Sequence, residues 1–443
     1  MSNPDNIASK PDCAKLRTAG TGPCGHGAHL ADLPCADRRS PACQELARSP
    51  LFLLTLVLVT ALGPLAMSSF VPAIPAIQRD FAVTGAIAQL TLTVSILTMA
   101  VASLGYGSLA DRFGRRPVLL GGITLGVIGS VLCAVGPTIE AVIAGRALQA
   151  AGASVGFVLA RVIVRDVYGD ERSASVLAYV TAAMTLAPML GPIMGGYLID
   201  SVGWRAVFVS VAVVAACLLA VVAVRLPETR PAAGNGTTAP IGSGYVRVLR
   251  NAAYVKFLAY ATMSQAAFFG FIAGAPYIMS EILGYPATVY GLYFFMVPFG
   301  YFIGSLIAGR YAERLSHERL TLAGAVAGLA ACALGWFWTA GAAFEPLSLF
   351  LPAALLAVAS GVALPGAQAG MLAAAGRHSG AGSGLFSFIQ LITSAIAAQL
   401  VGALQALGPS GVFGVMLVAS ALALIGYGLA ERRSKPRPGP QAP

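Results

Sequence analysis

The sequence predicts an all-α integral membrane protein with twelve transmembrane helices arranged in two six-helix halves. Three observations predict it: an apolar composition, a series of apolar segments long enough to span a membrane, and a motif that recurs in the second half of the chain. Of the 443 residues, 57% are hydrophobic and 10% are charged, against about 25% charged residues in ordinary soluble domains. A soluble protein of this composition could not cover its surface with polar groups.

A transmembrane helix needs about 20 predominantly apolar residues to cross the hydrocarbon core of the bilayer. Twelve segments of this kind are predicted, at 51–73, 85–110, 117–136, 140–163, 173–198, 205–225, 254–280, 288–309, 319–341, 346–368, 382–405 and 411–430. Prolines inside them, such as Pro64 and Pro298, are tolerated because neighbouring helices and side chains satisfy the backbone carbonyls that proline leaves free.

Lysine and arginine are distributed unevenly between the predicted loops. With both termini placed in the cytoplasm, 25 of the 28 basic residues fall in cytoplasmic segments; Arg79 and Arg205 fall outside, and Arg146 falls within a span. Short cytoplasmic loops of membrane proteins are enriched in basic residues. The distribution predicts a multi-pass protein of the cytoplasmic (inner) membrane with both termini inside. The net charge of +10 is therefore explained by the basic cytoplasmic segments and does not indicate a nucleic-acid partner.

Composition divides the chain into five parts. Residues 1–50 are polar, rich in Pro and Gly, and lack the apolar region of a signal peptide, so they are predicted to form a disordered cytoplasmic tail. The two halves are predicted at 51–226 and 254–431. A polar cytoplasmic linker at 227–253 joins them, and a cytoplasmic tail at 432–443 follows the second half.

The N-terminal tail contains Cys24, His26 and His29 between Cys13 and Cys35. Zinc sites usually pair cysteines that are two to four residues apart, and the cysteines here are spaced more widely. We therefore predict no metal site, and no cofactor.

The stretch 107–117, Gly-Ser-Leu-Ala-Asp-Arg-Phe-Gly-Arg-Arg-Pro, joins the second and third spans with a basic turn. We expect Gly107 to allow close helix contact and Gly114 to permit the tight turn. Residues 309–316 repeat the pattern 202 residues further on, with Ala, Glu and Arg in the matching places. The gating candidates of the first copy are Gly107, Asp111, Arg112, Gly114, Arg115 and Arg116.

This stretch resembles the signature loop of the major facilitator superfamily, Gly-x-Leu-Ala-Asp-Arg-x-Gly-Arg-Arg. The resemblance implies two six-helix halves, repeated in parallel, that face a central cavity. Asp111 is expected to be attracted to the N-terminus of the eleventh helix near Gly382, and to pair with Arg115. These contacts would hold the halves together on the cytoplasmic side when the cavity opens outward, and Asp166 is expected to join them. The alternative is that Asp111 is a solvated turn carboxylate.

Arg146 lies six residues into the fourth predicted span with apolar neighbours, where a lone charge costs several kcal/mol and needs a cavity or a partner. The string from Arg146 to Ala153 resembles the superfamily motif Arg-x-x-Gln-Gly-x-Gly, with Ala150 in place of one glycine. The resemblance ties this arginine to proton coupling. The alternative is that its side chain extends to the outer membrane interface.

Residues 187–198, Ala-Pro-Met-Leu-Gly-Pro-Ile-Met-Gly-Gly-Tyr-Leu, resemble the antiporter motif of the superfamily, Gly-x-x-x-Gly-Pro-x-x-Gly-Gly-x-Leu, with Ala187 at the first glycine. Small residues four positions apart let helices approach closely, and a proline bends a helix. The resemblance implies export. The residues that carry it are Gly191, Pro192, Gly195 and Gly196.

Further stretches resemble the bicyclomycin-resistance (Bcr/CflA) group of drug–proton antiporters; they are 70–77, 161–168, 203–208 and 226–229. Ser68 stands where that group often carries an aspartate. No acidic residue lies deep in a predicted span, yet an antiporter needs a group that changes its protonation. The candidates for proton coupling are therefore Asp111 and Asp166, with Arg146 as a fixed charge.

The resemblance also implies a substrate cavity lined by helices 1, 4, 7 and 10. Aromatic side chains beside a few polar groups form an adaptable surface for drug-like molecules. The candidates are Ser68, Arg146, Gln149, Gln265, Phe268, Phe269, Tyr277 and Gln368. An arginine without a buried acid predicts a preference for neutral or weakly acidic amphiphiles over cationic drugs.

The leading interpretation is a proton-coupled exporter of small amphiphilic molecules. Its expected partners are the substrate, protons and membrane lipid, and it is expected to be a monomer. An exporter of an endogenous metabolite on the same fold, and a non-transporting membrane sensor, are the alternatives. The chain is predicted not to be an enzyme, because it contains neither a nucleophile–histidine–acid pattern nor a phosphate-binding Gly-x-x-x-x-Gly-Lys.

Overall fold

The computed structural model describes the residues 49–229, 243–311, 314–339, 344–376 and 379–434. Their regular structure is helical throughout. The predicted tails at 1–50 and 432–443 fall almost wholly outside these ranges, as does the middle of the predicted linker.

The first half contains seven elements in chain order. They are α2 (Pro50–Phe70), η2 (Val71–Ala73), α3 (Ile74–Asp80), α4 (Gly85–Phe113), α5 (Arg115–Val135), α6 (Ile139–Ser201) and α7 (Arg205–Arg225). The second half begins with a short helix that precedes its first span. Its elements are α8 (Ser243–Leu249), α9 (Ala252–Tyr277), η3 (Ile278–Ile282), α10 (Ala287–Phe294), α11 (Met296–Tyr311), α12 (His317–Thr339), α13 (Pro346–Ala375), α14 (Ser379–Ala403), η5 (Gln405–Leu407) and α15 (Gly408–Ser434).

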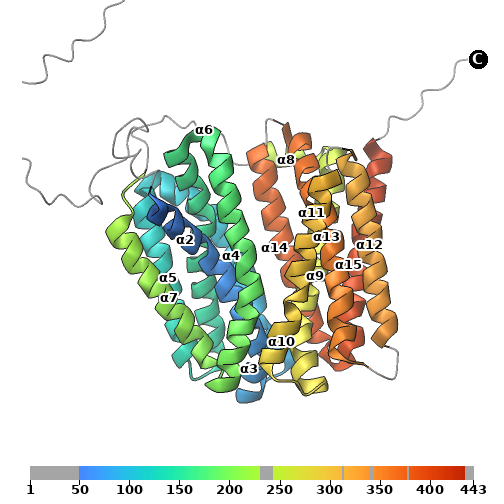
Figure 1. Cartoon of the computed structure of the whole chain (residues 1–443), viewed down its shortest axis with the longest axis horizontal. Coiled ribbons are helices and arrows are strands. Elements are labelled where there is room, and N and C mark those ends of the chain that lie inside the picture. Colours follow the sequence, from blue (N-terminus) through green and yellow to red (C-terminus); the bar gives the residue numbers. More distant parts are fainter. Residues whose placement is uncertain (1–48, 230–242, 312–313, 340–343, 377–378, 435–443) are drawn as a thin grey trace, which may run out of the picture.

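Eleven segments among the described residues are long and apolar enough to cross a membrane. The twelfth predicted span, 173–198, is the second arm of α6. Ala153 contacts α2 at Gly63, and Gly191 contacts α2 at Ser68, only five residues further along. In a straight helix Ala153 and Gly191 would lie about 57 Å apart. The helix therefore reverses between them into two antiparallel arms (Figure 1), and the predicted fold class is confirmed.

Two boundaries differ from the prediction for local reasons. The eighth predicted span, 288–309, is divided at Phe295 into α10 and α11. Pro298 has no backbone N–H to donate to the carbonyl four residues earlier, which weakens the helix at this point. The tenth predicted span continues to Ala375, because the residues after 368 are mostly alanine, the best helix former.

The two halves stand side by side and meet at one end (Figure 1). There α4 packs on α14, and α6 packs on α10. We call the end that carries Gln78, Asp200 and Thr288 the closed end. The opposite end, which carries Asp111 and Glu228, is called the linker end, and the halves diverge towards it in Figure 1.

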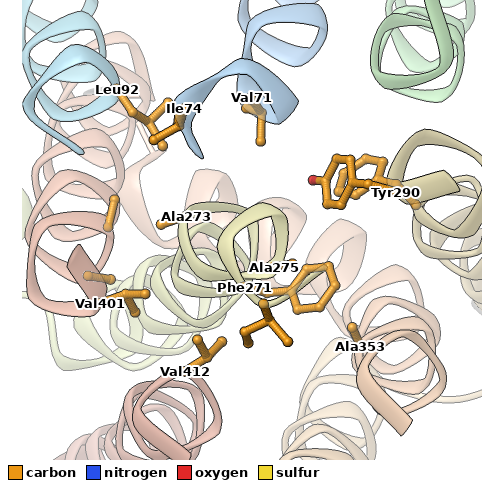
Figure 2. Close-up of a cluster of buried hydrophobic side chains, with 14 of the residues drawn as sticks. Val71, Ile74, Leu92, Phe271, Ala273, Ala275, Tyr290, Ala353, Val401 and Val412 are labelled. Carbon is orange, nitrogen blue, oxygen red and sulfur yellow. The ribbon is translucent and has the colours of Figure 1, made fainter. Parts of the chain in front are cut away.

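Hydrophobic packing follows the same division. One buried cluster lies within the first half and another lies within the second. The third cluster joins the halves near the closed end. Figure 2 shows Val71 and Ile74 of the first half opposite Ala273 and Tyr290 of the second. Apolar burial across this interface stabilises the arrangement in which the halves touch at the closed end.

Candidate functional site

The basic turn between α4 and α5 is held by charged groups of its own half. Arg115 donates from Nη1 to Asp111 Oδ1 at 2.6 Å and from Nε to Asp166 Oδ2 at 3.2 Å. The side chains of Arg115 and Asp166 are each 10% exposed, whereas that of Asp111 is 72% exposed. The structure therefore brings together three of the residues predicted from the sequence, with one guanidinium between two carboxylates.

Glu228 completes this network, and sequence reasoning did not single it out. Its carboxylate accepts hydrogen bonds from the backbone N–H groups of Arg115 at 2.8 Å and Arg116 at 3.2 Å, so it caps the N-terminus of α5. Gly114 has φ +102°, and a Cβ there would lie 2.6 Å from the Glu228 carboxylate. The positive φ favours glycine at this position, whereas the Glu228 carboxylate is the end of a flexible side chain and can move aside. Arg116 also donates to the carbonyl of Ala223 on α7 at 2.6 Å.

Two expectations for this turn are not met in this conformation. A Cβ on Gly107 would have nothing within 4 Å, so the expected close helix contact is not formed there. The start of α14 packs on the second half instead of reaching Asp111: Gly382 accepts a hydrogen bond from Tyr254 Oη at 2.7 Å. The contact between Asp111 and this helix stays a prediction. Arg112 lies over the ring of Phe113, 5.2 Å from its centroid.

Arg146 is buried, with 2% of its surface exposed, so the alternative of a side chain extended to the interface is wrong. It donates to the carbonyl of Thr91 at 3.4 Å and to Gln149 Oε1, and it contacts the sulfur of Met67. Its guanidinium lies over the Phe70 ring, 4.0 Å from the centroid. Its described partners are all neutral, so acceptors and a π face replace the missing counter-ion.

Small residues around Arg146 allow this burial. Gln149 is itself buried and donates to Ser130 Oγ on α5 at 2.8 Å. A Cβ on Gly152 would collide with the backbone of Gly126, so α5 and α6 approach each other backbone to backbone. The motif thus forms a packed polar centre inside the first half.

The glycine motif of the second arm of α6 faces two neighbours. A Cβ on Gly195 would collide with the backbone carbonyl of Ser69 on α2, within the same half. A Cβ on Gly196 would collide with the carbonyl of Ala287 on α10, in the other half. From the opposite side, a Cβ on Gly291 would lie 2.5 Å from the carbonyl oxygen of Pro192. The motif is therefore part of the contact between the halves at the closed end.

The predicted substrate residues are distributed over several environments. Ser68 lies on α2 and faces α6; its hydroxyl donates to the carbonyl of Pro64 at 2.7 Å and is 3.2 Å from the carbonyl of Ala187. On α9, Phe268 and Phe269 are half-buried, with ring centroids 5.9 Å apart. The half-buried amides among the candidates are Gln265 and Gln368. The structure therefore does not gather all eight candidates in one place.

Tyr277 lines a cavity of about 20 Å³ at the closed end, a volume that fits one water molecule. Gln78, Gln89 and Gln405 line the same cavity. Gln78 and Gln405 exchange two amide hydrogen bonds across the halves, at 3.3 and 3.1 Å. Thr93 donates to Gln399 at 3.0 Å. These glutamines lie in no recognised motif, and no local signal in the sequence could have identified them.

Ion pairs extend the contact at the closed end. Arg79 pairs with Glu281 across the halves, and Arg205 pairs with Asp80 at 2.8 Å within the first half. At the linker end, Lys256 is buried beside Phe257 and pairs with Glu318. Within the described ranges, no group of three or more His, Cys, Asp or Glu side chains is placed to hold a metal ion. The Cys- and His-containing tail lies outside those ranges.

The family model of the Major Facilitator Superfamily matches residues 56–285 and 257–443. The chain belongs to the Major Facilitator Superfamily. Multidrug resistance protein D of Escherichia coli (strain K12) is 28% identical over 375 residues, which cover 84% of this chain and 93% of that protein. Multidrug resistance protein MdtL of Escherichia coli O81 (strain ED1a) is 28% identical over 239 residues, which cover 54% of this chain and 61% of that protein.

Solved structures show the same superfamily fold. A bacterial homolog of the human lysosomal transporter Spinster, in its inward-facing and occupied conformation, has a TM-score of 0.71 at 15% identity, covering 90% of this chain and 100% of that chain. A D-xylose–proton symporter has a TM-score of 0.66 at 13% identity. The match covers 86% of this chain and 96% of that chain. At these identities the likeness concerns the fold alone. Fold and family together identify a multi-pass membrane transporter.

Proposed function

We propose that the protein is a proton-coupled antiporter of the bicyclomycin-resistance (Bcr/CflA) group that exports small amphiphilic drug-like molecules across the cytoplasmic membrane by alternating access. The observation that carries the proposal is the backbone contact of Gly196 with α10, since it makes the antiporter motif part of the seal between the halves. Relatives named as multidrug resistance proteins support the substrate class.

The charge distribution predicts which compartment each end faces. With both termini inside, the basic linker end is cytoplasmic and the closed end faces outward. The described conformation then receives substrate from the cytoplasm. Export requires the closed end to open and the linker end to close, and the exposed Asp111 is available for contacts made in that second state.

Proton coupling is assigned to the carboxylates that share Arg115. A proton bound by Asp111 or Asp166 removes one of the two charge-assisted hydrogen bonds on this guanidinium, which loosens α4 or α6 from the start of α5. Arg146 remains cationic throughout as a fixed charge inside the first half. Energy comes from the proton gradient, and the protein needs no cofactor.

The charges inside the spans set the substrate preference. The acidic side chains of the described spans lie at or beyond the ends of the membrane-spanning segments, while Arg146 places a positive charge in the interior. An interior with a cation and no anion disfavours cationic drugs and favours neutral or weakly acidic amphiphiles. Half-buried rings such as Phe268 and Phe269 suit the apolar part of these molecules.

Transport by purified protein in lipid vesicles tests the proposal. With an imposed pH gradient, efflux of a neutral phenicol should exceed efflux of a quaternary ammonium dye, and should be lost in Arg146→Ala and Asp111→Asn. Efflux that ignores the gradient would contradict proton coupling. Equal efflux of the dye would contradict the substrate preference. If neither compound moves while the protein binds both, drug export is wrong and a metabolite exporter or a sensor takes its place.

A further inference from the structure

Asp200 in the last turn of α6 forms a helix cap between the two halves. Its Oδ1 accepts a hydrogen bond from the backbone N–H of Ala287 at 3.1 Å, and its Oδ2 accepts from the N–H of Thr288 at 2.8 Å. The hydroxyl of Thr288 donates to the same Oδ2 at 2.6 Å. These are the first two residues of α10, whose own N-cap residue, Pro286, has no side-chain group that can cap. The cap of α10 is therefore supplied by the other half of the protein.

The surroundings of Asp200 differ from those of Asp80 and Glu281 at the same end. Asp80 pairs with Arg205, and Glu281 pairs with Arg79. In the part of the chain that the structure describes, no lysine or arginine nitrogen lies within 4.0 Å of Asp200. α10 carries no charged residue, so Asp200 is held by N–H groups, one hydroxyl and the positive end of the helix dipole.

The helices that carry this cap, α6 and α10, are also closely packed beside it. One turn before Asp200, Gly196 touches the backbone of α10, and Gly291 of α10 touches Pro192. The two helices can separate only if the hydrogen bonds to Asp200 break, because the bonds connect the end of one helix with the start of the other. A single carboxylate thus joins the two halves at this point.

We propose that Asp200 is an acid-sensitive gating residue. When ionised it caps α10 and holds the closed end together; when protonated it releases α10 and favours opening at that end. The proton adds to one carboxylate oxygen, and the group loses both its attraction to the helix dipole and most of its strength as an acceptor from two N–H groups.

The direction of this effect matches the proposed function, on which its physiological meaning depends. If the closed end faces outward, a proton that reaches Asp200 from the outer compartment would favour the outward-open state. That state must form for a substrate to leave. Asp200 would then act as a positioning residue for α10, distinct from the carboxylates around Arg115 that are proposed to carry the proton.

Hydrogen–deuterium exchange of the full chain in lipid nanodiscs tests the proposal without measuring transport. Exchange is compared at neutral and acidic pH, with labelling times scaled for the intrinsic pH dependence of amide exchange. In Asp200→Asn at neutral pH, the start of α10 should exchange about fivefold faster, the factor that corresponds to the loss of one helix cap. Exchange should also rise in the segments around Thr93 and Gln399, which make no contact with Asp200 but lie between the halves. Wild-type protein at acidic pH should show the same pattern.

Two matched variants make the result specific. Asp80→Asn removes a carboxylate at the same end that pairs within one half, and should leave exchange between the halves unchanged. Glu281→Gln removes the pair with Arg79 but should retain the response to acid.

The proposal is overturned if Asp200→Asn raises exchange only at the start of α10, because the cap is then purely local. It is equally overturned if the acid response persists in Asp200→Asn. Its failure leaves the transport assay unaffected, so the two proposals fail separately.

Discussion

Arg146 is the residue on which the interior of the first half depends. Its guanidinium is almost wholly buried and is held by the carbonyl of Thr91, the amide of Gln149 and the ring of Phe70. The sequence predicted a charge that needs partners, because a lone charge within a span is costly. It did not predict that the partners would be neutral, since all except Gln149 come from α2 and α4 through packing. The same limit applies to Ser68, which packs against α6 and does not share one site with all the other substrate candidates.

The first prediction concerns Arg146→Lys. A lysine keeps the charge but cannot donate to separate acceptors in a plane while stacking on a ring. Losing one charge-assisted hydrogen bond costs about 1.5–3 kcal/mol, so gradient-driven export should fall by more than tenfold. Initial rates in vesicles measure this. Arg250→Ala, at an exposed arginine of the linker end, serves as the control. A wild-type rate in Arg146→Lys would show that charge alone suffices.

The second prediction concerns Glu228→Ala. This change removes the cap from the first two N–H groups of α5, and should destabilise the first half by about 1 kcal/mol. The midpoint of thermal unfolding in detergent should therefore fall. Glu228→Gln retains an acceptor for the N–H groups and should recover part of the difference. An unchanged midpoint in both variants would mean that water replaces the cap at no cost.

At the scale of helices, the length of apolar segments predicts most of the fold. A bilayer demands about 20 apolar residues per span, and the predicted segments agree with the observed helices within a few residues at most ends. The break at Phe295 was not predicted, although Pro298 was visible, because proline is compatible with both a continuous and a broken membrane helix. The glycine motif of α6 predicted close packing, but its contact with α10 depends on how the halves meet, which no local pattern records.

The third prediction concerns this contact. Gly196→Val should prevent α6 from touching α10, since even one added carbon collides with the carbonyl of Ala287. Overpacking costs about 1–3 kcal/mol, so export should fall by about tenfold or more while the halves remain folded. Gly428→Val on α15 is the control, because a Cβ there meets nothing within 4 Å. Equal export by both variants would show that the closed end does not need this approach.

At the scale of the whole molecule, the inter-half hydrogen bonds and ion pairs that the structure describes lie towards the closed end. They include Gln78 with Gln405, Thr93 with Gln399, and Asp200 with Thr288. The network around Arg115 at the other end holds the first half to itself. The internal repeat in the sequence predicted two halves. It could not predict which end is closed, because both conformations of a transporter are encoded by one sequence and differ by a few kcal/mol.

The fourth prediction follows from alternating access. In a chain whose native cysteines are replaced, Gln78→Cys and Gln405→Cys should be joined by a short bifunctional thiol reagent, because their side chains touch. The link should abolish export, and cleavage of a reducible reagent should restore it. A link between Asp80→Cys and Arg205→Cys, within one half, should leave export intact. Export that persists through the first link would exclude opening at the closed end.

The neutral surroundings of Arg146 also have a consequence for biosynthesis. A helix with an arginine in its interior enters the bilayer at a cost of about 2.5–3.5 kcal/mol when it inserts alone. Apart from Gln149 on the same helix, the groups that contact Arg146 belong to α2 and α4, which precede it in the chain and are synthesised first. Each is complete before the ribosome reaches Arg146. Because these helices are made first, the span that carries Arg146 can insert against them and need not be exposed to lipid alone.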